Sequence, residues 1–150
     1  MHTIKVKIKK LPHYEGLELP SYQTPASCGM DILAAVPQEG LWLRQGQYQL
    51  VPAGIAIELP EGYEAQVRPR SGLAAKHGIT VLNSPGTVDA DYRGEIKVIL
   101  INLGQQNFFI ERGMRIAQLV IAPVCHADWQ VSKILEQSQR GDKGFGHTGL

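Results

Sequence analysis

The sequence predicts an all-β domain, a barrel or sandwich of short strands with many turns. Its dominant hydrophobic period is two, because aliphatic and polar residues alternate in short runs. The chain also contains 16 glycines and 9 prolines, and many of them bound these runs as turn residues do. Only one short segment has the signals of a helix. We therefore expect a β-fold with one short helix.

The alternation occurs in four runs. The expected strands cover residues 4–8, 55–59, 63–67 and 96–100. In each run the apolar side chains at every second position would share one buried face of a sheet. Residues 114–120 are expected to form a further core strand, in which Gln118 stands among aliphatic residues. A lone glutamine in such a strand is usually a hydrogen-bonded core amide.

The short helix is expected at residues 72–77. Ser71 is a suitable N-cap for this helix, and Gly78 is a suitable residue to end it. The helix would be about two turns long. Leu73 and Ala74 would face the interior.

The 150 residues fit one domain with one core, which we assign to residues 1–136. From Gln137 the sequence is rich in glycine and has one large apolar residue before its end. Residues 137–150 are therefore expected to form a Gly-rich C-terminal tail. Composition favours a disordered terminus, and the functional alternative is a lid that orders over a ligand.

The bulk composition excludes several classes of protein. Fifteen Lys and Arg residues stand against 14 Asp and Glu residues, and a net charge of +1 is no footprint for nucleic acid. From the sequence we expect neither a signal peptide nor a segment that spans a bilayer. Cys28 and Cys125 match no disulfide framework or zinc motif, and we expect free, buried thiols. We expect a complete cytoplasmic protein that binds neither nucleic acid nor membrane.

Two segments have the residue types of a phosphate or nucleotide site. At residues 68–72 a strand ends and the helix begins, so backbone N–H groups and the Arg70 guanidinium could meet phosphate oxygens. A capped helix beside a surface arginine explains this segment equally well.

The second segment, residues 83–95, has two turn signals around a short strand. Asp89 and Asp91 would share one face of that strand. A carboxylate beside a phosphate can deprotonate water, and Tyr92 could supply an aromatic wall. Solvated charges on a hairpin are the alternative.

Two further features suit a charged ligand. Asp31 stands in an apolar strand, where a buried carboxylate needs a cationic partner or a nearby metal. The Gly-rich tail is similar to a phosphate cradle, although it lacks the Gly-Lys-Ser/Thr ending of the usual phosphate-binding loop. Phe145, between two glycines, suits stacking on a base.

Five segments of the chain, in order, resemble the five motifs of the trimeric dUTPase family. They lie at residues 27–32, 69–74, 86–95, 112–119 and 140–149. One such motif would be weak evidence, but five in order with the right separations are very specific. They outweigh the structural explanations given above.

The resemblance implies a distorted jelly-roll fold, a homotrimer with three active sites at subunit interfaces, and Mg²⁺ as cofactor. It implies that dUTP is hydrolysed to dUMP and pyrophosphate through attack of water on the α-phosphorus. Such a reaction would limit uracil incorporation into DNA and supply dUMP for thymidylate synthesis.

The resemblance also assigns roles around the nucleoside. Asp89 would activate the attacking water, and Tyr92 would pack under the deoxyribose and exclude a 2′-hydroxyl. Asn83 would read the uracil edge together with the hairpin backbone. The remaining positions expected to enclose the base are Gly86, Thr87, Val88 and Lys97.

Other residues are implied to hold the phosphates and the metal. Arg70, Ser71 and Gly72 would come from a neighbouring subunit, and Gln118 would bond phosphate or ordered water. Asp31 would contact the waters of Mg²⁺ rather than the ion itself. The tail of a third subunit would supply Arg140 for the γ-phosphate, Phe145 to stack on uracil, and Gly146, His147 and Thr148 to wrap the phosphates.

Two positions depart from the family pattern. Lys143 stands where the family usually has glycine, and a positive φ there would cost about 1 kcal/mol. His147 stands where many members have serine. A protonated His147 would raise nucleotide affinity below about pH 6.5.

Three rival functions follow from the same sequence. In dCTP deaminase, which shares this fold, the catalytic glutamate would fall at Ile99, and an aliphatic side chain cannot perform that step. A nucleotide-binding protein without catalysis is disfavoured by the presence of Asp89, Tyr92, Arg140 and Phe145. A purely structural β-protein leaves the Gly-rich tail unexplained.

Overall fold

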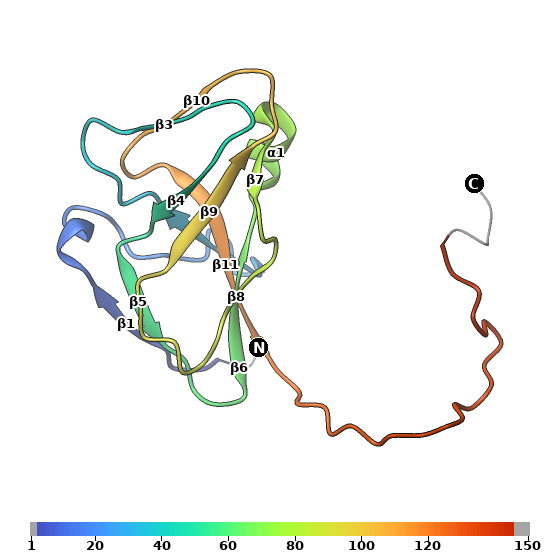
Figure 1. Cartoon of the computed structure of the whole chain (residues 1–150). Coiled ribbons are helices and arrows are strands. Elements are labelled where there is room, and N and C mark those ends of the chain that lie inside the picture. The colour runs from blue at the N-terminus through green and yellow to red at the C-terminus, as the bar shows by residue number, and fades with distance from the viewer. Residues whose placement is uncertain (1–2, 146–150) are drawn as a thin grey trace.

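The computed structural model describes residues 3–145. Within this range, short antiparallel strands enclose one core, and one α-helix lies at the edge of the body (Figure 1). The strands are β1 (Lys7–Lys10), β2 (Met30–Leu33), β3 (Leu41–Leu43), β4 (Tyr48–Pro52), β5 (Ile55–Glu58), β6 (Tyr63–Arg68), β7 (Ile79–Val81), β8 (Gly86–Val88), β9 (Lys97–Asn102), β10 (Phe108–Ile110) and β11 (Arg115–Pro123). The helices are the 3-10 helix η1 (Pro12–Tyr14) and the α-helix α1 (Ser71–His77). The predicted all-β class with one short α-helix is confirmed.

The described strands pair into small antiparallel sheets that wrap around the core as a distorted jelly roll. The sheets have the strand orders β1-β5, β10-β3, β2-β11-β6-β8 and β4-β9-β7. In the three-stranded sheet, β9 lies between β4 and β7. In the four-stranded sheet, β11 lies between β2 and β6, so Gln118 stands in register with Asp31 on one side and Arg68 on the other.

In the central strands, the apolar residues at every second position are buried in the core, as the alternation predicted. In β9, Val98, Leu100 and Asn102 are buried and the residues between them face outward. Asn102 is the polar exception: its amide donates to the carbonyls of Leu43 at 3.0 Å and Gln106 at 2.8 Å. Its side-chain oxygen also accepts from the backbone N–H of Gly104 at 2.9 Å. The buried amide is thereby satisfied.

The first strand differs from its prediction. β1 begins at Lys7 rather than near Ile4, and all of its residues are exposed. Ile8, expected on a buried face, is 40% exposed. Among the described strands β1 pairs only with β5, so it is an edge strand, and its lysines suit such an edge.

The helix also differs in detail. Arg70, not Ser71, occupies the N-cap position, and no side chain caps the helix. Ser71 is therefore the first helical residue. Gly78 ends the helix in a left-handed conformation with φ +66°, as predicted. Leu73 packs against the core, but Ala74 is exposed, because a helix of seven residues turns only a narrow face inward.

The last strand ends at Pro123, and residues 124–145 contain neither strand nor helix. Figure 1 shows this arm leaving the body after β11 and running clear of it. Large apolar side chains on the arm are almost fully exposed, namely Trp129, Val131, Ile134 and Leu135.

Both cysteines are free, but the prediction that they are buried is wrong. Cys28 and Cys125 are exposed, because Cys28 precedes β2 and Cys125 follows β11, outside the sheets that enclose the core. Within residues 3–145, no helix combines the length and the apolar character that a membrane span needs.

Candidate active site

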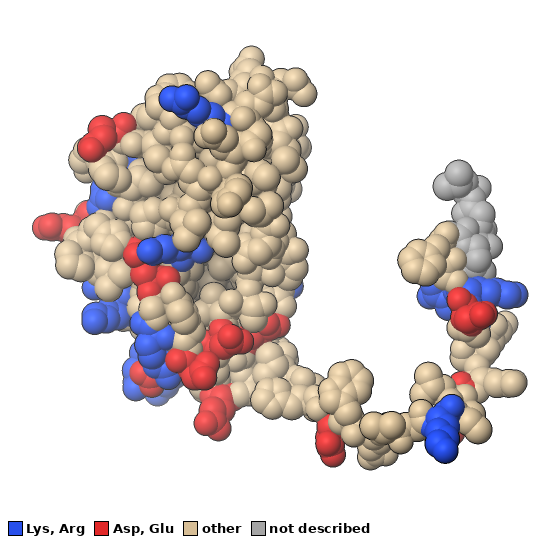
Figure 2. Space-filling model, viewed as in Figure 1, with Lys and Arg blue, Asp and Glu red and all other residues tan. Residues whose placement is uncertain are grey.

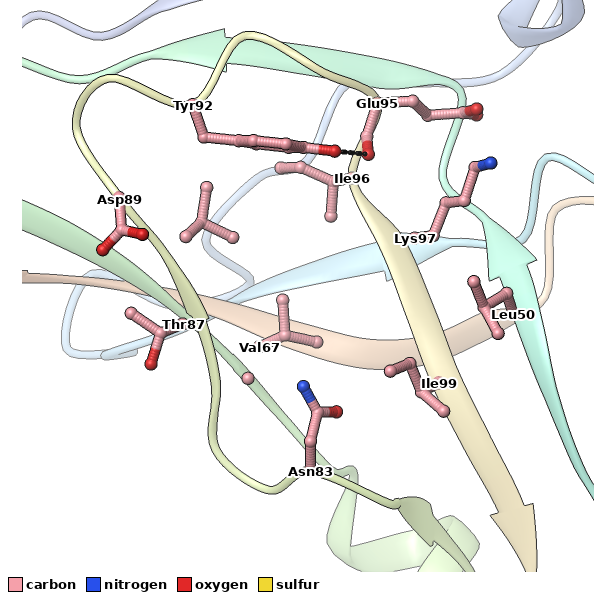
Figure 3. A pocket seen from close by; sticks show the side chains of 12 residues that line it. Leu50, Val67, Asn83, Thr87, Asp89, Tyr92, Glu95, Ile96, Lys97 and Ile99 are labelled. Carbon is pink, nitrogen blue, oxygen red and sulfur yellow. Dashed lines mark hydrogen bonds between the residues drawn. The ribbon is translucent and has the colours of Figure 1, made fainter.

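A pocket of about 470 Å³ opens between the β8–β9 connection and the strands β4, β6 and β9 (Figure 3). Seven residues predicted from the sequence line it: Asn83, Gly86, Thr87, Val88, Asp89, Tyr92 and Lys97. Residues that the sequence did not single out as lining are Leu50, Val67, Glu95, Ile96 and Ile99. The structure thus brings the predicted nucleoside-binding positions together in one open cavity.

The floor of the pocket depends on the absence of a side chain at Gly86. This buried glycine begins β8 beside β6. A Cβ atom there would lie 3.3 Å from Asn83 Nδ2 and 3.3 Å from Val67 Cβ. In Figure 3 the Asn83 amide points into the space between Val67 and Ile99. An amide offers both a donor and an acceptor to a ligand at this position.

Tyr92 forms the opposite wall. Its ring lies across the pocket above Ile96, and its hydroxyl donates to the carbonyl of Glu95 at 3.0 Å (Figure 3). Tyr92 is 46% exposed, so part of the residue is open to a ligand. A flat ring held in this way suits packing against another ring.

Asp89 reaches the pocket from the end of β8. The prediction that Asp89 and Asp91 share a strand face is wrong, because β8 ends at Val88. A turn follows, in which the N–H of Tyr92 donates to the carbonyl of Asp89 at 3.1 Å. Asp89 lines the pocket and Asp91 does not. Among residues 3–145 the Asp89 carboxylate has no ion-pair or hydrogen-bond partner, so it is available to accept a proton.

A second cluster lies where β2, β11 and α1 meet. Asp31 is buried at 7% exposure, and its Oδ1 lies 3.2 Å from Nε of Arg70. Its Oδ2 lies 3.7 Å from Nε of Arg115, and Arg70 also donates to the carbonyl of Arg115 at 3.1 Å. The buried carboxylate therefore has two cationic partners, which meets one of the two requirements expected from the sequence.

Asp31 keeps spare acceptor capacity despite these ion pairs. Its Oδ1 is buried and makes no hydrogen bond within the described part of the chain, because the nearby Arg70 Nε is not aligned for one. Two guanidinium groups beside one carboxylate also disfavour direct contact with a further cation. No group of three or more His, Cys, Asp or Glu side chains among residues 3–145 could hold a metal ion by itself.

The positions predicted to hold phosphate are not in the pocket of this chain. Ser71 and Gly72 are exposed at the start of α1 beside Arg70, and Gln118 is half-buried in β11. None of these residues lines the pocket. The pocket and the arginines beside Asp31 are therefore two separate clusters of the folded chain.

The tail is also away from the pocket. Arg140 donates from Nε to the carbonyl of Lys143 at 2.8 Å, and Phe145 is fully exposed with φ +53°. Lys143 is not among the residues with positive φ, so the strain considered from the sequence does not arise in this conformation. The predicted positions Gly146, His147 and Thr148 lie outside the described residues.

The pocket residues that the sequence did not single out have two origins. Glu95 is the last residue of the third motif, so the motif itself could have indicated it as a site residue. The residues that it contacts in the folded chain could not be predicted from the motif. Leu50 and Ile99 meet because β4 pairs with β9, where they are partners in register. No local pattern indicates that pairing.

The fold and the pocket together define an all-β protein with a small-molecule site whose groups suit a ring and a polar edge. A family model described as dUTPase matches residues 15–149. The chain belongs to the dUTPase family.

Relatives and solved structures agree. The chain is 62% identical over 150 residues to the deoxyuridine 5′-triphosphate nucleotidohydrolase of Maricaulis maris, covering 99% of both chains. It is 59% identical to the enzyme of the same name from Rickettsia akari, covering all of both chains. It also resembles the structure of Staphylococcus bacteriophage 80alpha dUTPase with dUPNHPP, with a TM-score of 0.87, 25% identity, and coverage of 99% of this chain and 100% of that one.

A further structural neighbour is a mutant dUTPase from phage phi11 of S. aureus, described with a coordinated structural Mg(II) ion. Its TM-score is 0.77 at 21% identity, with 89% of this chain and 100% of that chain covered. At this identity the likeness supports the fold alone.

Proposed function

We propose that this protein hydrolyses dUTP to dUMP and pyrophosphate, which limits uracil incorporation into DNA and supplies dUMP for thymidylate synthesis. The observation that carries the proposal is the pocket in which Asp89, Tyr92 and Asn83 meet. The relatives named deoxyuridine 5′-triphosphate nucleotidohydrolase, identical at 59–62% of positions, support the choice of substrate. We infer that the reaction takes place in the cytoplasm.

In this proposal Asp89 is the general base. Its carboxylate lines the pocket without a partner among the described residues, so it can take a proton from water. The oxygen of that water forms a bond to the α-phosphorus as the bond from the α-phosphorus to the bridging oxygen breaks. Pyrophosphate leaves with the electron pair of the broken bond.

The same pocket accounts for the selection of the nucleoside. The Tyr92 ring packs against the deoxyribose, where a 2′-hydroxyl would have no room. Asn83 and the backbone at Thr87 and Val88 hydrogen-bond the edge of uracil. Gly86 and Lys97 complete the enclosure, and its tightness excludes the methyl group of thymine.

Arg70, Ser71 and Gly72 hold the phosphates of a nucleotide that occupies the pocket of another subunit. Their exposure at the start of α1 and their absence from this chain's own pocket support a shared site. Gln118 bonds phosphate or ordered water nearby.

The residues present fit Mg²⁺ bound to the nucleotide phosphates rather than a cage of protein ligands. The Asp31 side chain is 8% exposed, so its carboxylate can accept from water molecules around the ion, and the two arginines beside it disfavour direct ligation. When bound, Mg²⁺ supplies positive charge that offsets the charge developing on the leaving pyrophosphate.

Apolar surface supports the homotrimer. Tyr48 and Leu50 on β4 are more than half exposed and stand in register with Ile101 and Ile99 on β9. The right-hand part of the body in Figure 2, where β9 and β7 run, is mostly free of charged side chains. Exposed apolar side chains on a surface with few charges are typical of an interface between subunits.

The tail completes the site in another subunit. Residues 137–150 act as a lid, with Arg140 on the γ-phosphate and Phe145 stacked on uracil. Gly146, His147 and Thr148 wrap the phosphates. The reach of the arm beyond the body in Figure 1 supports a role outside its own chain.

The proposal is tested by pyrophosphate release from dUTP, dTTP, dCTP and UTP in the presence of Mg²⁺. We expect rapid release from dUTP alone. In Asp89→Asn, kcat should fall by about 10²–10⁴ while the unfolding temperature stays unchanged. Release from several nucleotides would refute the selective pocket, and dUTP binding without any release would make the protein a nucleotide-binding protein rather than an enzyme.

A further inference from the structure

The position of Tyr92 depends on the residues that follow it along the chain. Its hydroxyl donates to the carbonyl of Glu95, and its ring lies directly over Gly94. A Cβ atom on Gly94 would come within 2.4 Å of the Tyr92 hydroxyl oxygen and 2.6 Å of Cζ. The Tyr92 ring therefore contacts the backbone of residues 94–95, and a shift of that backbone would move the ring.

The side chain of Glu95 binds to a different part of the molecule, the β4–β5 turn and the 3-10 helix η1. Its carboxylate points away from Tyr92 in Figure 3. Oε1 accepts a hydrogen bond from the backbone N–H of Gly54 at 2.9 Å and also pairs with Nε2 of His13. The Glu95 side chain is only 16% exposed, so these two partners replace water around one carboxylate oxygen.

Gly54 is a rigid attachment point. It has φ +68°, and a Cβ atom there would lie 2.8 Å from Cβ of Ala35 and 3.0 Å from the ring of Tyr14. Its carbonyl also accepts from the N–H of Leu11 at 2.9 Å. The turn between β4 and β5 is therefore held by Ala35, Tyr14 and Leu11 and does not follow Glu95 if the β8–β9 connection shifts.

His13 is held just as firmly by its backbone. Arg112 donates to the carbonyls of His13 and Glu15, at 2.8 Å each, and to that of Val36 at 2.8 Å. One guanidinium thus fixes η1 against the loop before β3. His13 precedes residue 15, where the match to the family model begins.

These contacts form one continuous connection from η1 through Glu95 to the ring that faces the sugar. We propose that Glu95, tied to His13 and Gly54, is a positioning residue for Tyr92, and that His13 thereby sets how strictly the pocket rejects a ribose 2′-hydroxyl. The inference rests on the proposed function. The Tyr92 ring can exclude a 2′-hydroxyl only if the ring cannot move away from the sugar. Small displacements at a reacting site change rates by large factors.

The test compares the ratio of kcat/KM for dUTP to kcat/KM for UTP in His13→Ala, Glu95→Ala and wild type. We expect both variants to lower this ratio by about tenfold, through a gain in UTP turnover more than through a loss with dUTP. His13→Gln retains an N–H donor for Glu95 and should restore most of the selectivity. Glu58→Gln breaks the exposed Lys7–Glu58 ion pair on β1 and β5 and is the matched control, with an unchanged ratio.

If the contacts of Glu95 with His13 and Gly54 only stabilised the fold, the variants would behave differently. His13→Ala and Glu95→Ala would then lower the unfolding temperature while the dUTP/UTP ratio of the folded enzyme stayed at the wild-type value, and the proposal would be wrong. If Glu95→Ala does not fold, His13→Ala in combination with Tyr92→Phe decides, since each of these changes breaks one link of the connection. Removal of the tyrosine hydroxyl disconnects the ring from Glu95, so the effects of the two changes on the ratio should be non-additive. Simple additivity overturns the connection.

The outcomes also separate the two proposals. Absence of dUTP turnover in the wild type would overturn the proposed function and, with it, the positioning role. Selective dUTP turnover in the wild type, with an unaltered ratio in both alanine variants, would overturn the positioning role alone.

Discussion

Asp31 in β2 and Arg70 at the start of α1 form an ion pair in which the carboxylate is buried, with 3.2 Å between Oδ1 and Nε. The pair joins segments that are far apart in the sequence, and Arg115 in β11 approaches the same carboxylate from the other side at 3.7 Å. The arginine expected to meet phosphate is therefore anchored from within its own chain.

Asp31→Asn should weaken both the fold and phosphate binding. The substitution leaves two guanidinium groups facing a neutral amide, and partly exposed arginines moderate the effect to about 1–2 kcal/mol of unfolding free energy. Urea unfolding measures this loss, and the KM for dUTP should rise because Arg70 is no longer held. Glu58→Gln removes an exposed ion pair instead and should leave both values unchanged. Equal behaviour of the two variants would contradict the anchoring role.

Gly104→Ala should destabilise the protein strongly. A Cβ atom on Gly104 would come within 2.1 Å of the carbonyl oxygen of His77, so two backbone segments would have to separate. Overpacking of this kind costs about 1–3 kcal/mol. Gly72→Ala is the matched control, because nothing lies within 4 Å of the added atom. Thermal unfolding should show a large fall for the first variant and none for the second.

Tyr48→Asp should disrupt the assembly. Tyr48 is 58% exposed and in register with Ile101 on the apolar face of the β4-β9-β7 sheet. A carboxylate buried there in an interface would lack a partner. Light scattering should give a trimer for the wild type and a smaller species for the variant. Tyr22→Asp changes a tyrosine that is 52% exposed before β2 and should remain trimeric. A monomeric wild type would refute the homotrimer.

Deletion of residues 137–150 should abolish most turnover without affecting the fold. The described hydrogen bonds of this segment run within it, from Gly141 to Ser138 and from Lys143 to Arg140. The unfolding temperature should therefore match that of the full chain, while kcat/KM for dUTP falls by at least about tenfold. A truncated protein with full activity would show that the tail is not a lid.

Stability should fall at high pH because of Tyr14. Burial, and secondarily the charge of Glu18, raises the pKa of Tyr14 above its usual 10.0. Since the folded state favours the protonated phenol, the stabilisation is complete below the unfolded pKa and is lost as pH rises through the folded pKa. The free energy of unfolding should thus decrease above about pH 10, the usual tyrosine pKa. In Tyr14→Phe this part of the decrease should disappear. An identical slope in both proteins would exclude Tyr14 as the cause.

Much of this protein could be predicted from residues taken a few at a time. Alternation in β6 and β9, the glycine after α1 and the order of five motifs are local properties, and each reflects the geometry of a strand, a helix end or a binding loop. They were sufficient for the all-β class, the family and seven of the residues that line the pocket.

Other features were decided only by the tertiary structure. The turn after Val88 separates Asp89 from Asp91, the ends of β2 and β11 leave both cysteines exposed, and Glu95 pairs with His13 across 82 positions of sequence. Each depends on which strands lie side by side and on how much of a side chain they cover. A local pattern states which face a residue prefers, but its partner is whatever the rest of the folded chain brings to that face.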